Sequence, residues 1–178
     1  MEATARRCGR AVQWRAILLG VIFRTTGAVP LSEQRLRGDY ARRDLARLAR
    51  RMGLPFATAT PPPATSIALA RVFHAIALTD AGLAARFAAE AFMATFAHGE
   101  ALDGLDAAQS LAARLGPAAE AAAAEALSPA AREALRAATQ EAMAQGVFGA
   151  PFFVADGEPF WGQDRLPMLK AWLRERPW

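Results

Sequence analysis

The sequence predicts an α/β protein that is mostly helical, and three observations support this prediction. Apolar residues make up 53% of the 178-residue chain, and about a quarter of all residues are alanine, a strong helix former. Between residues 65 and 145 apolar residues recur at helical spacing. The last third changes to two short apolar runs around an Asp-Gly pair, a pattern typical of a β-hairpin. The length suits one domain.

The first 53 residues predict a helix, a strand and a longer helix. Residues 2–7 (EATARR) are expected to form a helix that ends before a glycine. Residues 12–19 (VQWRAILL) are predicted to be a buried strand, followed by a loop from Gly20 onward. Ser32 is placed to cap a helix that runs to Met52.

The middle of the chain predicts a helical block. The Pro61–Pro63 run is expected to form a rigid connector before it. Thr79, Asp106 and the Ser128-Pro129 pair mark helix starts. The expected helices cover residues 65–78, 80–97, 106–126 (broken at Gly116-Pro117) and 129–145.

The C-terminal part predicts a hairpin followed by a helix. Residues 151–155 (PFFVA) and 158–161 (EPFW) are the expected strands, joined by the two-residue turn Asp156-Gly157. The last helix follows Gln163, with Asp164 at or near its cap and leucines along one face.

Charge and cysteine content limit the possible functions. Residues 1–52 carry 12 arginines and four acidic residues, whereas residues 53–178 carry nine basic and 13 acidic residues. The arginines of residues 42–51 share helical spacing with Leu45 and Leu48, so we interpret them as a solvated helix face, with nucleic-acid binding as the alternative. Cys8 is the only cysteine, which excludes a disulfide or a dithiol redox pair within the chain.

Membrane and metal binding are not expected either. The apolar run of residues 16–23 is shorter than the roughly 20 residues that a spanning helix needs, and it ends at Arg24. His74 lies among apolar residues at helical spacing and His98 lies at a polar helix end, so neither is expected to be catalytic. Two isolated histidines without a carboxylate cluster predict no metal site. These features suggest a cytoplasmic protein that binds neither membranes nor nucleic acid.

One C-terminal segment is specific enough to suggest a family. Residues 146–166 (GVFGAPFFVADGEPFWGQDRL) resemble the C-terminal signature of 2-hydroxychromene-2-carboxylate isomerases and kappa-class glutathione transferases, members of the disulfide-oxidoreductase-like thioredoxin superfamily. Residues 14–20 (WRAILLG), 40–53 (YARRDLARLARRMG) and 63–71 (PATSIALAR) are similar to the same family. The resemblance covers the chain from about residue 9 onward.

The resemblance implies a thioredoxin-like fold with a large all-helical insertion and with its first strand missing. Residues 1–53 would be a partial N-terminal half of the thioredoxin-like domain. Residues 54–145 would be the helical insertion, and residues 146–178 the C-terminal hairpin and helix. Because the missing strand lies centrally in the family's sheet, we expect about 25 to 30 further residues to be encoded upstream, estimated as one strand, a loop and most of a helix.

The resemblance also implies a glutathione site. The family's proline is cis and exposes the backbone of the preceding residue, here Ala150 before Pro151, to the cysteinyl part of glutathione. Gln163 and Asp164 correspond to residues that hold the γ-glutamyl end. Arg37 takes the place of a lysine that contacts a carboxylate.

Other roles remain open for each of these residues. Pro151 fits the start of an edge strand, Asp164 fits a helix cap, and Arg37 fits a solvated surface. Trp161 and Phe160 would line the wall of the substrate site, although Phe160 fits the core at least as well.

The sequence departs from the family in several places. Ala28 and Thr65 stand where asparagine is common. The family's catalytic serine, which helps to hold the sulfur of glutathione as a thiolate, has no counterpart, because none of the four serines follows an N-terminal strand. No residue of this chain is therefore assigned a catalytic role.

Three functions follow from the resemblance. The first is glutathione-dependent isomerisation of 2-hydroxychromene-2-carboxylate in aromatic catabolism, with this chain inactive as it stands. The second is the transfer of glutathione to electrophiles at the same site, as in a kappa-like transferase. The third is a catalytically dead glutathione-binding or scaffold protein. The expected partners are glutathione and a small aromatic substrate, with a homodimer possible.

Overall fold

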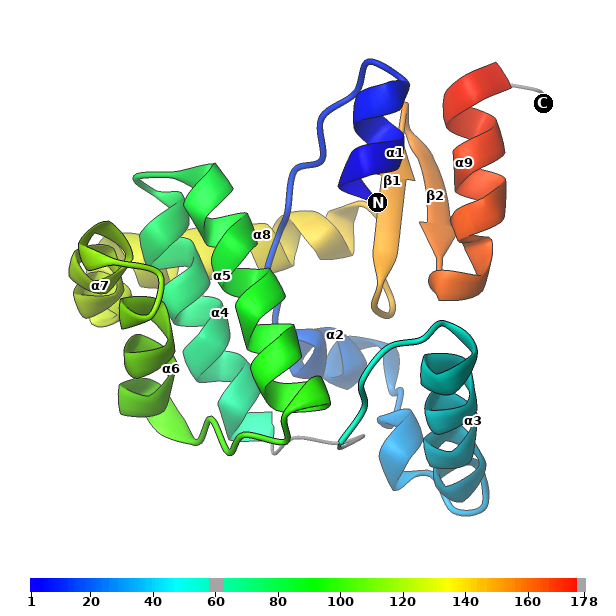
Figure 1. The fold of residues 1–178 in the computed structure, drawn as a ribbon, viewed down its shortest axis with the longest axis horizontal. Helices are drawn as coiled ribbons and strands as arrows, with labels where there is room; N and C mark the ends of the chain where they lie inside the picture. The colour runs from blue at the N-terminus through cyan, green and yellow to red at the C-terminus, as the bar shows by residue number, and fades with distance from the viewer. Residues whose placement is uncertain (58–62, 176–178) are drawn as a thin grey trace.

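The computed structural model describes residues 1–57 and 63–175. The protein is mostly helical, with one small sheet (Figure 1). Its elements are α1 (Glu2–Arg7), α2 (Leu19–Thr26), η1 (Leu31–Glu33), α3 (Arg37–Arg51), α4 (Pro63–Ala77), α5 (Ala81–Phe92), the π-helical turn η2 (Met93–Ala97), α6 (Gly104–Ala113), α7 (Pro117–Ala124), η3 (Glu125–Leu127), α8 (Pro129–Ala144), β1 (Phe152–Ala155), β2 (Glu158–Trp161), η4 (Gln163–Arg165) and α9 (Leu166–Glu175).

The helices α4 to α8 form one packed body, which we call the helical unit (Figure 1). Its largest fully buried side chains are Val72, Ile76, Phe87 and Leu111. Buried alanines fill the remaining positions, and their small side chains let the helix backbones approach closely. The four predicted helical segments are thus confirmed, including the break before Pro117.

The observed helix caps of the helical unit agree with the sequence prediction before α8 and differ from it before α5 and α6. The Ser128 side chain accepts a hydrogen bond from the amide of Ala131, as predicted. The cap before α5 is Asp80 rather than Thr79, because the Asp80 carboxylate accepts from the amide of Leu83 at 2.9 Å. The cap position of α6 is Asp103 rather than Asp106.

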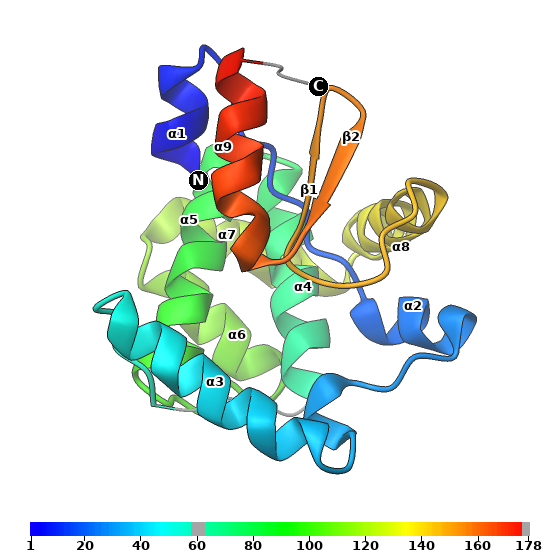
Figure 2. The same cartoon turned by 90° about the vertical axis from the view of Figure 1, so that its right-hand side faces the viewer.

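The second body, the hairpin unit, consists of β1, β2, η4 and α9. The strands pair antiparallel with Ala155 opposite Glu158, and the turn residues Asp156 and Gly157 both have positive φ, of 56° and 87°. This is the predicted two-residue turn. Helices α1 and α9 lie side by side against one face of the hairpin, where Phe160 and Leu169 are buried (Figure 2).

The predicted strand at residues 12–19 is wrong. Residues 11–18 form no strand, and α2 begins at Leu19 where a loop was expected from Gly20. In the described part of the chain the sheet contains only β1 and β2, so this segment has no neighbouring strand with which to share a ladder. The side chains of His74 and Thr139 in the helical unit form hydrogen bonds with the backbone of this segment.

The single helix expected from Ser32 to Met52 is also wrong at its start. Ser32 lies in η1, and α3 begins at Arg37 after Leu36, which has φ 68°. Gly38 packs so closely on η1 that a Cβ there would lie 2.6 Å from the Ser32 carbonyl oxygen. The chain therefore turns before α3, and Ser32 cannot cap it. Of the expected proline connector, residues 61 and 62 lie outside the described residues.

Candidate functional site

The base of the hairpin brings together most of the residues predicted to bind glutathione. The Ala150–Pro151 peptide is cis, as the resemblance implies. The Pro151 carbonyl accepts a hydrogen bond from the amide of Gly162 at 2.9 Å. This bond ties the loop before β1 to the turn after β2. Ala150 and Pro151 are therefore held beside the turn that carries Gln163 and Asp164.

An aromatic patch lies at the same end of the hairpin. Trp161, the predicted wall of the substrate site, is 52% exposed, and Phe148 is 47% exposed. Their ring centroids are 4.8 Å apart, and the ring of Phe152 packs edge-on against Phe148. Exposed aromatic rings beside polar groups are typical of sites that bind flat apolar ligands.

The polar turn lies between this patch and α9. Gly162 occupies the cap position of η4 with φ 95°, a conformation that favours glycine. Asp164 lies inside the turn, where its carboxylate reaches back over Gly162 and forms an ion pair with Arg165 at 3.4 Å. Asp164 is therefore near the cap position but not at it. The turn precedes the N-terminus of α9, whose amides provide positive partial charge.

Arg37 is not brought to this site. It lies at the start of α3, which is separate from β1, β2 and α9 in both views (Figures 1 and 2). Its guanidinium lies 3.5 Å from the amide oxygen of Gln34. Ala28 lies in the chain between α2 and η1, and the side chain of Thr65 is outside the described part of the structure.

The serines also lie away from the hairpin base. Ser32 is in η1, Ser66 in α4 and Ser110 in α6, while Ser128 caps α8. Cys8 follows α1, at the end of that helix next to the hairpin turn, where Arg10 bonds Asp156. The structure thus places no serine beside Pro151.

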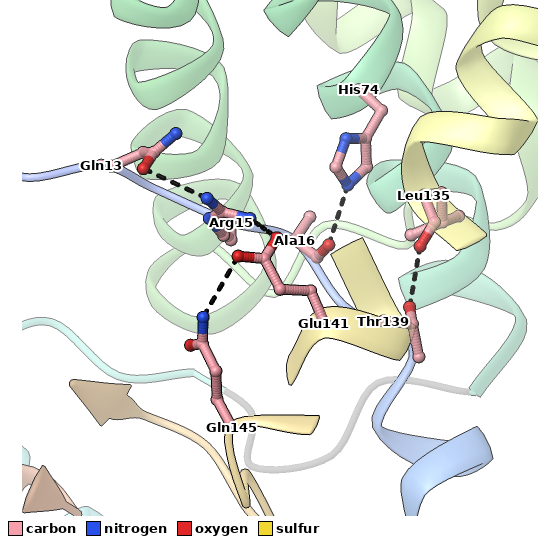
Figure 3. Close-up of polar contacts among 8 residues, drawn as sticks. All are labelled: Gln13, Arg15, Ala16, His74, Leu135, Thr139, Glu141 and Gln145. Carbon is pink, nitrogen blue, oxygen red and sulfur yellow. Dashed lines mark hydrogen bonds and ion pairs between the residues drawn. The ribbon is translucent and has the colours of Figure 1, made fainter. Parts of the chain in front are cut away.

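A second cluster connects residues 11–18 to the helical unit (Figure 3). The His74 ring nitrogen Nε2 donates to the Ala16 carbonyl at 2.8 Å, and the amide of Leu18 donates to Thr139 Oγ1 at 3.1 Å. The Thr139 hydroxyl in turn donates to the Leu135 carbonyl. Burial lowers the pKa of His74, the Ala16 hydrogen bond opposes this, and the positive charge of Arg15 lowers the pKa further.

Charged groups complete this cluster at its exposed side. Arg15 forms an ion pair with Glu141, which also accepts from the side chain of Gln145 (Figure 3). An open groove of about 940 Å³ lies next to them, between residues 11–15 and the alanine-rich faces of α5 and α8. The apolar neighbours of His74 in the sequence agree with its burial. Its partner, the backbone carbonyl of Ala16, is distant in sequence and could not be predicted.

The described residues lack two other kinds of feature. None of their helices combines the length and apolar character needed to cross a bilayer. Within residues 1–57 and 63–175, no three histidine, cysteine, aspartate or glutamate side chains gather as a metal site would require.

Comparison with known proteins agrees with this geometry. The profile of the DSBA-like thioredoxin domain matches residues 1–174. The chain belongs to the DSBA-like thioredoxin family. A solved structure of 2-hydroxychromene-2-carboxylate isomerase (HCCA isomerase) superposes with a TM-score of 0.81 and 26% sequence identity. The match covers 94% of this chain and 81% of that structure. A search of curated protein sequences gave no match.

The thioredoxin-like fold with a helical insertion is thereby confirmed. In this family member the sheet of the described residues is reduced to the hairpin, and the helical unit supplies most of the buried core.

Proposed function

We propose that this DSBA-like protein binds glutathione at the base of its hairpin, in the manner of a glutathione-dependent isomerase of aromatic carboxylates such as 2-hydroxychromene-2-carboxylate. The likeness to HCCA isomerase over 94% of the chain carries the proposal. The geometry of the hairpin base supports it, because a polar turn and an exposed aromatic patch adjoin one loop.

Each part of the tripeptide has a proposed partner. The backbone of Ala150 would pair with the cysteinyl residue, as in the addition of a single residue to a strand edge. The γ-glutamyl carboxylate would meet the amides of the turn at Gln163, and its ammonium would meet the Asp164 carboxylate, which is 62% exposed. The aromatic substrate would lie on Trp161. Arg37 has no part in this arrangement because α3 lies elsewhere.

The proposed chemistry lacks one group in this chain. In the isomerase reaction the thiolate of glutathione adds to the substrate, the ring opens, a bond rotates, and the thiol is eliminated. A hydroxyl that donates to the sulfur favours the thiolate. Since no serine lies beside Pro151, we propose that residues 1–178 bind glutathione without measurable isomerase turnover.

Calorimetry and an activity assay on the purified chain test this proposal together. Glutathione is titrated first, and 2-hydroxychromene-2-carboxylate is then added with glutathione while absorbance is followed. Binding without turnover is the expected result. Turnover would show that another group activates the sulfur, with Ser66 the next residue to replace. Conjugation of an electrophile such as 1-chloro-2,4-dinitrobenzene would favour a kappa-like transferase. Absence of glutathione binding would overturn the proposal.

A further inference from the structure

The indole ring of Trp161 is confined by its neighbours at the hairpin base. Trp161 ends β2 opposite Phe152, and the Phe148 ring meets the indole at an interplanar angle of 61°. A Cβ atom built on Gly149 would lie 2.5 Å from Trp161 Nε1 and 3.1 Å from Cε2. The ring therefore lies so close to the backbone of Gly149 that a side chain at this position would require the indole to move.

Backbone conformation does not explain the glycine at position 149. The φ angle of Gly149 lies outside the left-handed region, whereas Gly162, which directly follows Trp161, has φ 95°. A side chain at Gly162 would be strained by its left-handed backbone, and this source of strain is missing at Gly149. The position of the indole ring, rather than the backbone conformation, therefore accounts for the glycine at position 149.

The indole also carries a hydrogen-bond donor. An indole N–H can only donate, and among the residues that the structure describes none accepts a hydrogen bond from Trp161 Nε1. Trp161 is about half exposed and directly precedes the turn of Gln163 and Asp164. A flat apolar surface and a donor thus lie side by side. An aromatic carboxylate, which joins a flat ring to an anionic oxygen acceptor, has the complementary chemistry.

We propose that Gly149 and Trp161 form a matched pair that presents the indole to the substrate. The ring packs against the aromatic body of the ligand, and Nε1–H donates to one of its carboxylate oxygens. Trp161 is then a binding residue, and Gly149 is a positioning residue that acts through it. The inference rests on the proposed function, because it names how the aromatic half of that site recognises its substrate.

Four proteins test the pair: the wild-type chain, Gly149→Ala, Trp161→Phe and the double variant. Salicylate is the aromatic carboxylate probe, titrated by calorimetry, and the indole N–H resonances are followed by NMR. Trp161→Phe identifies the Trp161 resonance, which Gly149→Ala should shift. Each single variant should weaken salicylate binding about tenfold, and the double variant should be no weaker than Trp161→Phe, because both changes remove one contact.

Matched controls separate the pair from general effects. Gly20→Ala in α2 adds a Cβ in open space, and Trp14→Phe removes an indole that bonds Glu2 elsewhere. Both should leave salicylate affinity unchanged. Wild-type protein that does not bind salicylate, an unmoved Trp161 resonance in Gly149→Ala, or additive losses in the double variant would each overturn the pair. Glutathione is titrated separately, so its failure to bind would remove the glutathione proposal while the salicylate result still decides the pair.

Discussion

The helical unit and the hairpin unit bury their apolar side chains to very different extents. Phe87 and Leu111 of the helical unit are almost completely buried in one continuous core. The hairpin unit buries Phe160 and Leu169, but it leaves Trp161 about half exposed. The helical unit therefore supplies most of the stability, while the hairpin unit keeps an aromatic surface and a polar turn available for a ligand.

The largest effect should come from emptying the core of the helical unit. Leu111→Ala should lower the free energy of unfolding by about 3 to 5 kcal/mol, because the surrounding helices cannot close the cavity. Leu169→Ala in α9 removes the same atoms from a similarly buried position. Because the hairpin unit is thinner, its side chains should move to fill part of the cavity, and the free energy of unfolding should fall by about 2 kcal/mol. Urea unfolding of both variants measures this. Equal losses would contradict the contrast between the units.

The connection between the units should depend on pH through His74. Because burial makes the folded pKa of His74 lower than 6.5, its value when unfolded, the unfolded state binds more protons. Stability should therefore fall as the pH falls below 6.5. His74→Leu should cost about 1 to 3 kcal/mol at neutral pH by leaving the Ala16 carbonyl without its donor.

The pH profile distinguishes this role from simple packing. The difference between wild type and His74→Leu should narrow from about pH 8 to about pH 5, because only the wild type has a buried imidazole to protonate. His98 is exposed at the end of η2, so His98→Gln serves as the control and should leave the profile as it is. Parallel profiles for wild type and His74→Leu would count against the linkage.

A smaller effect is expected at Thr139, which bonds the same segment from α8. Thr139→Val removes the acceptor of the Leu18 amide and should cost about 1 kcal/mol. Thr79→Val removes a hydroxyl that bonds only the carbonyl of Ile76 at a helix end, and it should cost less than about 0.5 kcal/mol. Thermal melts of the two variants test the ranking.

The smallest effect concerns the contact between Arg10 and the hairpin turn. The guanidinium meets the two Asp156 oxygens at 2.8 and 2.9 Å, but both side chains retain solvent contact. Asp156→Asn keeps a residue that tolerates positive φ and should cost less than about 1 kcal/mol. A greater loss in low salt than in high salt would confirm that charge is responsible. A loss above about 2 kcal/mol would mean that the turn itself depends on the aspartate.

The sequence predicts local structure well where one short segment determines it. Asp156-Gly157 specifies a turn by its own φ preferences, and Ser128-Pro129 specifies a helix start through its own side chain and ring. The helical unit is predicted for a similar reason, since alanine and leucine favour helix and their helical spacing gives each helix an apolar face to bury.

Contacts between segments that are distant in sequence could be predicted less well. Residues 12–19 have the composition of a strand, but a strand needs a neighbouring strand. In the described part of the chain the backbone of this segment is instead bonded by side chains of α4 and α8. The residues predicted to bind glutathione at the hairpin base adjoin because they are close in sequence. Arg37 is more than 100 residues away in sequence, so its position relative to the hairpin base depends on where α3 packs. It does not lie beside these residues.

The central claim is that the turn before α9 holds the ammonium of glutathione through Asp164. Asp164→Asn keeps the shape of the side chain but removes its charge, so glutathione should bind more weakly by roughly 1.5 to 3 kcal/mol, about tenfold or more. Asp39→Asn is the matched control, because Asp39 also lies in a first helical turn and pairs with an arginine, Arg42.

Calorimetric titration of glutathione into wild type, Asp164→Asn and Asp39→Asn, each checked by a thermal melt, gives the most direct answer. We expect a loss of glutathione affinity for Asp164→Asn alone, with all three melting temperatures nearly equal. Unchanged glutathione affinity in Asp164→Asn, at an unchanged melting temperature, would contradict it.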